Sequence, residues 1–267
     1  MKIAVSTSSF GLHSQKPIEI IKKKGWSIFL NPYKRTLKKE EVGKFINDAD
    51  GLLAGVECLD DEVLSSLNNI KVISRIGVGT DNIDFTSARK KRIKVYKTET
   101  TPALAVAELV LGMAISLSRN IIEANEKMKL GIWEKKMGTL LYGKKLGIIG
   151  LGAIGKTLAK VSKGLNFDIY AFDKNIDHNF RKENNINYIS LEQIMEECDI
   201  ISIHLSLNHK TRNLINKEMI SKMKKNAIII NASRGGIVDE NELFNALEGK
   251  RIGGAALDVY NYEPYKG

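Results

Sequence analysis

The sequence predicts an α/β protein whose two sheets are mainly parallel. Short apolar runs alternate with amphipathic stretches along almost the whole chain, which is the pattern of repeated βαβ units. A long apolar helical stretch near the middle interrupts this pattern, so we expect one α/β series on each side of it. The 267 residues, 43% hydrophobic and 27% charged, suffice for two small domains and exclude a globally disordered chain.

The first α/β series covers residues 1–98. We expect strands at 2–6, 26–30, 51–54, 71–75 and 93–96, and helices at 16–24, 38–47, 60–67 and 84–91. Runs of lysine and arginine end two of these helices, at 22–24 and 89–92, where the helix dipole favours cations. The net charge of +10 is therefore interpreted as solvated helix ends. A nucleic-acid partner is disfavoured, because aromatic residues are not interleaved with the lysines. No membrane partner is expected, because no stretch approaches the roughly 20 uninterrupted apolar residues of a membrane span.

A single long helix is predicted between the two series. Thr101 suits its N-cap and Pro102 its first helical position. The stretch that follows, in TPALAVAELVLGM, is apolar on nearly every face. Such a helix is expected to be buried between two domains or two subunits.

The second α/β series begins near Lys145 and belongs to a domain that we delimit as residues 99–267. Its strands are expected near 147–149, 168–172, 200–204, 227–231 and 254–257. The N-terminus lacks the basic and apolar regions of a signal peptide, so a cytoplasmic location is expected. Cys58 and Cys198 are far apart and predict neither a disulfide nor a zinc site, but two small core residues. No metal site is expected.

The strongest local signal is the glycine pattern in LGIIGLGAIG. Gly150, Gly152 and Gly155 follow an apolar run and precede a helical pattern, and a second apolar run then ends at Asp173. This context is typical of a dinucleotide-binding βαβ unit, with the pyrophosphate at the helix N-terminus. Asp173 would accept hydrogen bonds from a ribose 2′-hydroxyl and repel a 2′-phosphate, which favours NAD over NADP. The alternative is a glycine turn in a domain that binds no nucleotide.

Three further clusters follow predicted strands. Gly77 and Gly79 could expose consecutive amides as an anion nest, although a tight turn explains them equally well. Arg234 ends a strand at the edge where parallel sheets bind ligands, and its planar guanidinium suits a carboxylate. Asp258 and Glu263 lie just beyond the last strand.

Taken together, these motifs resemble those of the D-isomer-specific 2-hydroxyacid dehydrogenase family, in its phosphoglycerate dehydrogenase-like branch. The matching segments occur in order as RIGVGTDNID, TPALAVAELVLGM, LGIIGLGAIG, HLSLNHKTRNLI, NASRGGIVDE and AALDVYNYEP. The resemblance implies a flavodoxin-like substrate domain, a Rossmann NAD-binding domain and a site in the cleft between them. It also implies homodimers, formed largely through the NAD domain and the long helix.

The resemblance assigns a role to individual residues. Gly77, Val78 and Gly79 match the loop whose amides bind the substrate carboxylate. Arg234 matches the catalytic arginine, and Glu263 matches the acid that pairs with the catalytic histidine. The positions that match the cofactor lining are Val78, Gly150, Gly152, Ala153, Ile154, Gly155, Asp173, His204, Leu205, Ala232, Ser233, Arg234 and Asp258.

The family interconverts D-2-hydroxy acids and 2-oxo acids by hydride transfer to or from NAD, while a histidine moves the hydroxyl proton. That histidine lies in a TPH-type segment beyond the glutamate, and none of the four histidines of this sequence matches it. The segment that closes the substrate domain in the family is missing as well. We therefore expect a C-terminally truncated chain that binds NADH but has impaired turnover. The alternative is a catalytically inactive NAD(H) sensor or corepressor-like protein.

A second departure concerns the substrate. Phosphoglycerate-specific relatives usually place an arginine after the third strand, whereas this sequence has Ala54, Gly55, Val56 and Glu57. An acid at this place is expected to repel a phosphate. Glyoxylate, hydroxypyruvate and other small 2-oxo acids are therefore expected to be better substrates than a phosphorylated acid.

Overall fold

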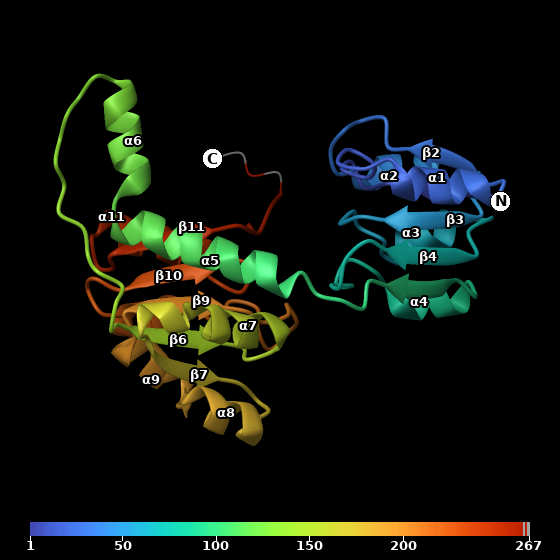
Figure 1. The fold of residues 1–267 in the computed structure, drawn as a ribbon. Helices are drawn as coiled ribbons and strands as arrows, with labels where there is room; N and C mark the ends of the chain where they lie inside the picture. Colours follow the sequence, from blue (N-terminus) through green and yellow to red (C-terminus); the bar gives the residue numbers. More distant parts are fainter. Residues whose placement is uncertain (264, 266–267) are drawn as a thin grey trace. The chain divides into compact units, whose positions relative to one another are not determined.

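The computed structural model describes residues 1–263 and 265 of the 267-residue chain. The chain forms two compact units, Met1–Thr101 and Pro102–Gly267. The sequence placed a boundary between residues 98 and 99, and residues 264, 266 and 267 of the domain expected there lie outside the described residues. The two units are described separately below (Figure 1).

The first unit is an open, all-parallel five-stranded sheet with the strand order β2-β1-β3-β4-β5. This order is that of flavodoxin-like folds, so the predicted α/β class is confirmed for this unit. Its elements are β1 (Lys2–Val5), α1 (Lys16–Lys23), β2 (Ser27–Leu30), α2 (Lys39–Ile46), β3 (Gly51–Ala54), α3 (Asp61–Ser66), β4 (Val72–Arg75), α4 (Phe85–Lys90) and β5 (Lys94–Lys97).

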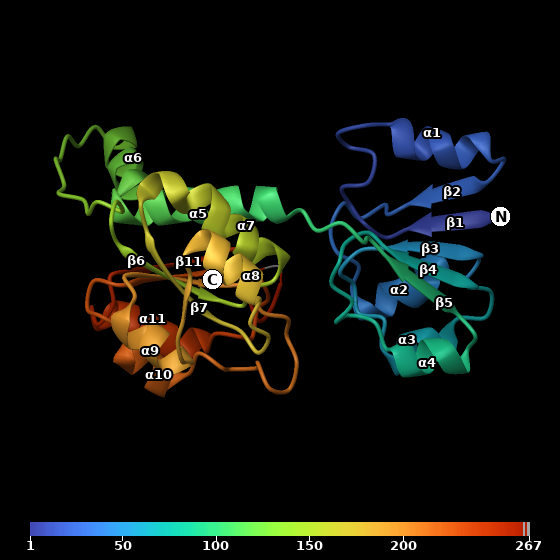
Figure 2. The same cartoon turned by 60° about the horizontal axis from the view of Figure 1, so that its bottom comes forward.

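The core of the first unit lies between the sheet and the helices α2, α3 and α4, which Figure 2 shows on one side of the strands. Ala4, Leu52 and Ile73 point from three strands into this core and are fully buried or nearly so. The carboxylates of Asp60 and Asp84 begin α3 and α4 by accepting hydrogen bonds from amides of the first turn. Both helices are thus fixed close to the strand ends.

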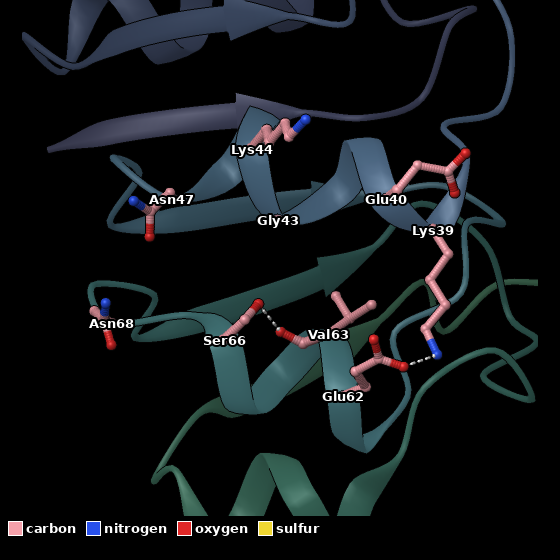
Figure 3. A pocket seen from close by; sticks show the side chains of 9 residues that line it. All are labelled: Lys39, Glu40, Gly43, Lys44, Asn47, Glu62, Val63, Ser66 and Asn68. Carbon is pink, nitrogen blue, oxygen red and sulfur yellow. Dashed lines mark hydrogen bonds and ion pairs between the residues drawn. The ribbon is translucent and has the colours of Figure 1, made fainter.

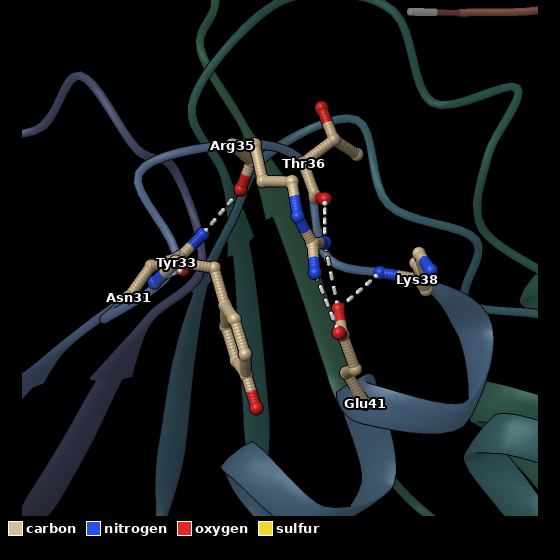
Figure 4. A network of polar contacts seen from close by, with 6 residues as sticks. All are labelled: Asn31, Tyr33, Arg35, Thr36, Lys38 and Glu41. Carbon is tan, nitrogen blue, oxygen red and sulfur yellow. Dashed lines mark hydrogen bonds and ion pairs between the residues drawn. The ribbon is translucent and has the colours of Figure 1, made fainter.

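A polar network holds the segment between β2 and α2 (Figure 4). The Arg35 guanidinium binds both carboxylate oxygens of Glu41, at 2.6 and 2.8 Å, and lowers the pKa of that carboxyl to about 2. The Asn31 side chain donates to the Arg35 carbonyl at 2.8 Å and to the Ser6 carbonyl at 2.6 Å. The segment is therefore tied to the end of the neighbouring strand β1.

The second unit is an all-parallel six-stranded sheet with the strand order β11-β10-β9-β6-β7-β8. In chain order this is the 3-2-1-4-5-6 arrangement of the Rossmann fold, which confirms the predicted fold. Its helices are α5 (Ala103–Ser118), α6 (Ile121–Lys129), α7 (Ala153–Val161), the 3-10 helix η1 (Ser162–Leu165), α8 (His178–Asn184), α9 (Leu191–Glu197), α10 (Lys217–Lys222) and α11 (Glu240–Glu248). Its strands are β6 (Lys145–Ile149), β7 (Asp168–Phe172), β8 (Asn187–Tyr188), β9 (Ile200–Ile203), β10 (Ile228–Asn231) and β11 (Gly254–Leu257).

Both faces of this sheet are covered by helices. Ile201 and Ile229 pack with α9, α10 and α11 on one face. Ile200 and Ile228, one residue earlier on each strand, pack with α5, α7 and α8 on the other. Because successive side chains of a strand point to opposite faces, the near-continuous isoleucine runs are explained by burial on both sides.

The prediction of a single long helix between the two series is wrong. The chain forms two helices, α5 and α6, bent by 64° at a short break. Asn120 adopts the left-handed conformation there, with φ of 54°, and its side chain donates to the Met137 carbonyl at 3.2 Å. Asparagine tolerates this conformation, so it can end one helix and begin another. The N-cap of α5 is Pro102, one residue later than the expected Thr101.

Cys58 also differs from its prediction. Cys198 is fully buried, as expected, whereas Cys58 is exposed.

In the described part of the chain no single helix is long and apolar enough to cross a membrane, while the bent pair α5 and α6 passes that test by length and composition alone.

A glycine on β6 fixes the distance between the sheet and α9. A Cβ at Gly147 would lie 2.6 Å from Cγ2 of Ile194 and 2.9 Å from Sγ of Cys198. We expect Gly147→Ala to lower the free energy of unfolding by about 1–3 kcal/mol, because the overpacked helix must shift. Chemical denaturation measures the change. The matched control is Gly164→Ala, where a Cβ meets nothing within 4 Å, and an equal loss in both variants would contradict this explanation.

Candidate functional site

The candidate site lies at the carboxyl edge of the second unit's sheet. Because all six strands are parallel, the residues that follow them gather at this one edge. The strand order reverses between β6 and β9, which is the topological switch point where such sheets bind ligands. The predicted residues that directly follow strands are Gly150 after β6, Asp173 after β7, His204 after β9, Ala232 after β10 and Asp258 after β11.

The glycine loop after β6 has the geometry of a dinucleotide cradle. Gly150 has a φ of +98°, and a Cβ there would lie 2.7 Å from the His204 carbonyl oxygen. A Cβ at Gly155 would lie 2.3 Å from the Gly150 carbonyl oxygen, so only glycine lets α7 pack this closely. By contrast, a Cβ at Gly152 would meet nothing within 4 Å. The loop is thus closed on the protein side and open on the outer side.

The start of α7 presents unused hydrogen-bond donors to this open side. Gly152 is the N-cap and supplies no side-chain cap, so the first-turn amides, including those of Ala153 and Ile154, are available to an anion. Asp173 accepts hydrogen bonds from the Leu151 amide at 2.7 Å and from the Asn175 amide at 2.9 Å. Its carboxylate is thereby fixed beside the glycine loop, with lone pairs left for ribose hydroxyls. These residues fit NAD.

His204 is an enclosed histidine at the same edge, followed by Leu205. Its Nε2 lies 2.8 Å from the Ser202 hydroxyl, and its Nδ1 is buried without a hydrogen-bond partner in the described structure. Burial lowers the pKa of His204 to about 4. The ring is therefore neutral at pH 7, which suits a lining residue better than a proton-transfer residue.

Arg234 is positioned by a compact turn that the sequence analysis did not single out. Asn231, the last residue of β10, accepts hydrogen bonds at its Oδ1 from the Ser233 amide at 3.1 Å and from the Ser233 hydroxyl at 2.7 Å. Its Nδ2 donates to the Arg234 carbonyl at 2.9 Å. A side-chain amide folding back onto its own backbone is an Asx turn. This turn makes the chain leave the strand just before Arg234 and fixes the Arg234 backbone.

Gly235 brings the loop that carries Glu263 against the arginine loop. A Cβ at Gly235 would lie 2.0 Å from the Tyr260 carbonyl oxygen, so the two backbones are in direct contact. The exposed Glu263 accepts a hydrogen bond from the Tyr260 amide at 3.0 Å. Glu240, at the start of α11, accepts one from the Asn261 amide at 2.6 Å. Two predicted catalytic residues thus lie on loops that touch.

The predicted carboxylate-binding loop lies in the first unit, after β4. Gly77 has a φ of +146°, and its amide donates to the Arg75 carbonyl and the Thr98 hydroxyl, each at 3.0 Å. Within the described residues the amides of Val78 and Gly79 donate no hydrogen bond. Arg75 was missed in the sequence, although its guanidinium lies against Gly77, where a Cβ would be 2.5 Å from Nη1.

The first unit also has a groove that is separate from its carboxylate-binding loop. A groove of about 770 Å³ lies between α2 and α3 (Figure 3), lined by side chains of both charges such as Lys39, Lys44 and Glu62. None of the predicted site residues lines it. Among residues 1–263 and 265, no group of three or more His, Cys, Asp or Glu residues could hold a metal ion.

Comparison with known proteins decides the family. Residues 111–267 match the model of the D-isomer specific 2-hydroxyacid dehydrogenase NAD binding domain. The chain belongs to the D-isomer-specific 2-hydroxyacid dehydrogenases. Its second unit is the NAD-binding domain of this family, which confirms the resemblance and the predicted cofactor.

Sequence relatives within the family include two enzyme types. A D-3-phosphoglycerate dehydrogenase of Methanocaldococcus jannaschii is 40% identical over 235 residues, covering 86% of this chain and 45% of the relative. A hydroxypyruvate reductase of Thermotoga maritima is 37% identical over 233 residues, covering 85% and 74%. The chain thus spans about half the length of several curated relatives that it matches.

Solved dehydrogenase structures match this chain over almost its whole length. D-lactate dehydrogenase from Aquifex aeolicus, complexed with NAD and lactic acid, matches with a TM-score of 0.84 and 26% identity over 98% of this chain and 77% of the other. The apo form of D-lactate dehydrogenase from Escherichia coli matches with a TM-score of 0.84 and 27% identity, over 99% and 84%.

The low pKa of His204 makes stability depend on pH. The unfolded chain binds this proton below about pH 6.5, whereas the folded chain binds it only below about 4. The neutral His204 ring therefore contributes to the free energy of unfolding above about pH 6.5. This contribution, up to about 3 kcal/mol, is lost as the pH falls towards 4. We expect His204→Gln to flatten the unfolding free energy between these pH values in denaturation experiments. The control His13→Gln, at an exposed position, keeps the wild-type slope, and an unchanged slope in His204→Gln would refute the assignment.

Proposed function

We propose that the protein is an NAD-dependent oxidoreductase that interconverts a D-2-hydroxy acid and a 2-oxo acid. The observation that carries the proposal is the contact between Gly235 and the Tyr260 backbone. It places the loops of Arg234 and Glu263 together beside the NAD-binding edge of the sheet. An arginine and a carboxylate at that place suit the binding of an α-keto carboxylate and the orientation of a proton donor.

The residues of this chain have distinct roles in the proposed reaction. NAD, when bound, supplies the hydride acceptor or donor. The Arg234 guanidinium binds the substrate carboxylate and stabilises the charge that develops on the C2 oxygen. Glu263 is assigned to the orientation of a histidine general acid/base. The free amides of Val78 and Gly79 support their role in carboxylate binding. We assign residues 1–98 to the substrate domain and residues 99–267 to the NAD-binding domain.

The proton-transfer group is the part that these residues do not supply. The four histidines are His13, His178, His204 and His209, and none lies on the loops of Arg234 or Glu263. We infer that a polypeptide of just these 267 residues binds NADH. Its kcat should be lower than that of a dehydrogenase with the histidine by at least the roughly 10²-fold effect of losing a general acid/base.

The alternative is an NAD(H) sensor without turnover. Such a protein would bind NADH through the glycine loop but would not need the paired loops of Arg234 and Glu263. A 2-oxo acid analogue that cannot be reduced, such as oxamate, separates the two functions. Oxamate should tighten NADH binding if the site is that of a dehydrogenase.

We also propose that the protein is a cytoplasmic homodimer. Two free cysteines suit a reducing compartment. In Figure 1, α6 projects from the second unit and the segment after it returns to β6. This arm, residues 121–142, exposes apolar side chains, among them Leu130 at 75% and Trp133 at 84%. Exposed apolar surface of this kind marks an interaction site, and a second copy offers the same apolar surface.

Activity tests the proposed function directly. NADH oxidation is measured with glyoxylate and hydroxypyruvate, together with NADH binding. We expect at least one 2-oxo acid to be reduced, and Arg234→Lys to lower kcat/KM by at least about 10²-fold, since one bidentate contact in the transition state is lost. NADH binding should persist in this variant. The control Arg251→Lys, at an exposed position, should retain full activity. NADH binding without turnover, and without any effect of oxamate, would favour the sensor instead.

Substitutions in the arm test the proposed homodimer. We expect Leu130→Glu combined with Trp133→Glu to convert the dimer to a monomer in light scattering, because two charges would be buried in the interface. Leu12→Glu, at a side chain that is 73% exposed in the first unit, is the control and should leave the dimer intact. A wild-type monomer at micromolar concentration would contradict the proposal.

A further inference from the structure

A polar pocket lies at the amino edge of the second unit's sheet, opposite the edge that carries the glycine loop. Its volume is about 410 Å³, and its walls come from residues just before or at the starts of β6, β9, β10 and β11, from the end of α5 and from residues 137–141 of the arm. In Figure 1 the segment after α6 returns to the start of β6 on this side of the sheet. None of the residues predicted for the NAD site lines this pocket.

Three lysines line the pocket, and one of them is paired. Lys224 donates to Oδ1 of Asp199 at 3.0 Å, and the Lys145 amide donates to Oδ2 at 2.9 Å. Although burial opposes ionisation of Asp199, these two contacts lower its pKa. With the described residues, the ammonium groups of Lys144 and Lys225 form neither an ion pair nor a hydrogen bond. Two positive charges in the lining are therefore not neutralised.

Hydrogen-bond donors without a partner accompany these charges. The Thr139 hydroxyl, the Asn226 side-chain amide and the Asn226 backbone amide donate to no other described residue. The carbonyl of Ser118, at the C-terminal end of α5, would repel an anion, but it already accepts a hydrogen bond from the Thr139 amide at 2.7 Å. The lining thus offers donors and positive charge, which is the chemistry of an anion site.

The register of the sheet sets the spacing of the two unpaired lysines. Leu146 of β6, Ile200 of β9 and Ile228 of β10 lie side by side across three neighbouring strands. Lys144 and Lys225 precede the two outer strands of these three, which are about 10 Å apart. Lysine side chains are long and flexible, so both ammonium groups can reach one ligand between them. An anion with two charged groups suits this spacing better than a single small ion.

We propose that this pocket binds a small anion with two linked phosphate groups, at a site distinct from the NAD site. Lys144 and Lys225 each neutralise one phosphate, and Thr139 and Asn226 donate hydrogen bonds. Lysine acts as a point charge that suits phosphate, whereas the planar fork of arginine favours a carboxylate. The inference goes beyond the proposed function, because it concerns neither the acid substrate nor hydride transfer.

Binding at this site has a consequence for the arm. The end of the arm is held to α5 by the Thr139 amide and by the Asn120 side chain, which donates to the Met137 carbonyl at 3.2 Å. Without a ligand, the like charges of Lys144 and Lys225 repel each other. A bound diphosphate replaces this repulsion by attraction and bridges the arm to the turn before β10. It therefore stabilises the packed position of the arm.

Calorimetry with inorganic pyrophosphate tests the site on the whole chain. Saturating NADH occupies the glycine loop, which is the other place where a pyrophosphate is expected to bind. We expect Lys144→Gln and Lys225→Gln each to raise the Kd of pyrophosphate about tenfold, because each loses a charge-assisted contact. Lys144→Arg keeps the charge and should largely restore binding. The control Lys163→Gln removes an exposed lysine outside the pocket and should leave the Kd unchanged.

Trypsin cleavage in the arm gives an independent measurement. The arm carries Lys135 and Lys136, and pyrophosphate should slow cleavage there several-fold in the wild type but not in Lys144→Gln. If Lys163→Gln weakens binding as much as Lys144→Gln, the anion is attracted only by the net charge of the protein, and the inference is overturned. Absence of pyrophosphate binding at low salt, or a cleavage rate that pyrophosphate does not change, would also overturn it. None of these results bears on the proposed dehydrogenase reaction.

Discussion

Parallel pairing of every strand is the constraint on which the rest of the structure depends. In a parallel sheet the chain must leave each strand at the same edge and return over a face, so loops with chemical groups converge while helices cover the core. Both sheets obey this rule. The second sheet is covered on both faces by helices that pack on alternate isoleucines. The packed layers therefore supply the framework, and the residues just after each strand supply the groups that bind ligands.

Much of this arrangement could be predicted from the sequence. Strands such as 51–54, 168–172 and 254–257 have the expected bounds, because apolar runs flanked by turn residues are strong local signals. Gly150 and Gly155 make the close backbone contacts that the motif predicts, Gly150 with the His204 carbonyl and Gly155 with the Gly150 carbonyl, whereas Gly152 faces open space. The carboxyl-edge positions of Asp173 and Arg234 follow from the strand pattern itself.

Other features depend on contacts between distant residues and could not be predicted. The break at Asn120 interrupts a helical pattern that continues on both sides, and the local sequence gives no sign of the Met137 contact that accompanies it. Gly235 looks like an ordinary turn glycine until the Tyr260 backbone is seen against it. Glu57 is an acid that burial propensity would place outside, yet it is buried. Its hydroxyl and amide partners at Ser6 and Gly55 become apparent only when β1 and β3 pair.

The contrast between the two cysteines offers an experimental handle. Burial raises the pKa of the Cys198 thiol to about 12 and closes it off from solvent; partial burial and Asp60 raise the pKa of Cys58 too, but the Cys58 side chain is exposed. Thiol reagents need a thiolate that they can reach, so they should modify one position and spare the other. Cys58 directly follows Glu57 in the loop after β3. A spectroscopic label could therefore be attached to the native chain at a single place, and its signal would report the motion of this loop.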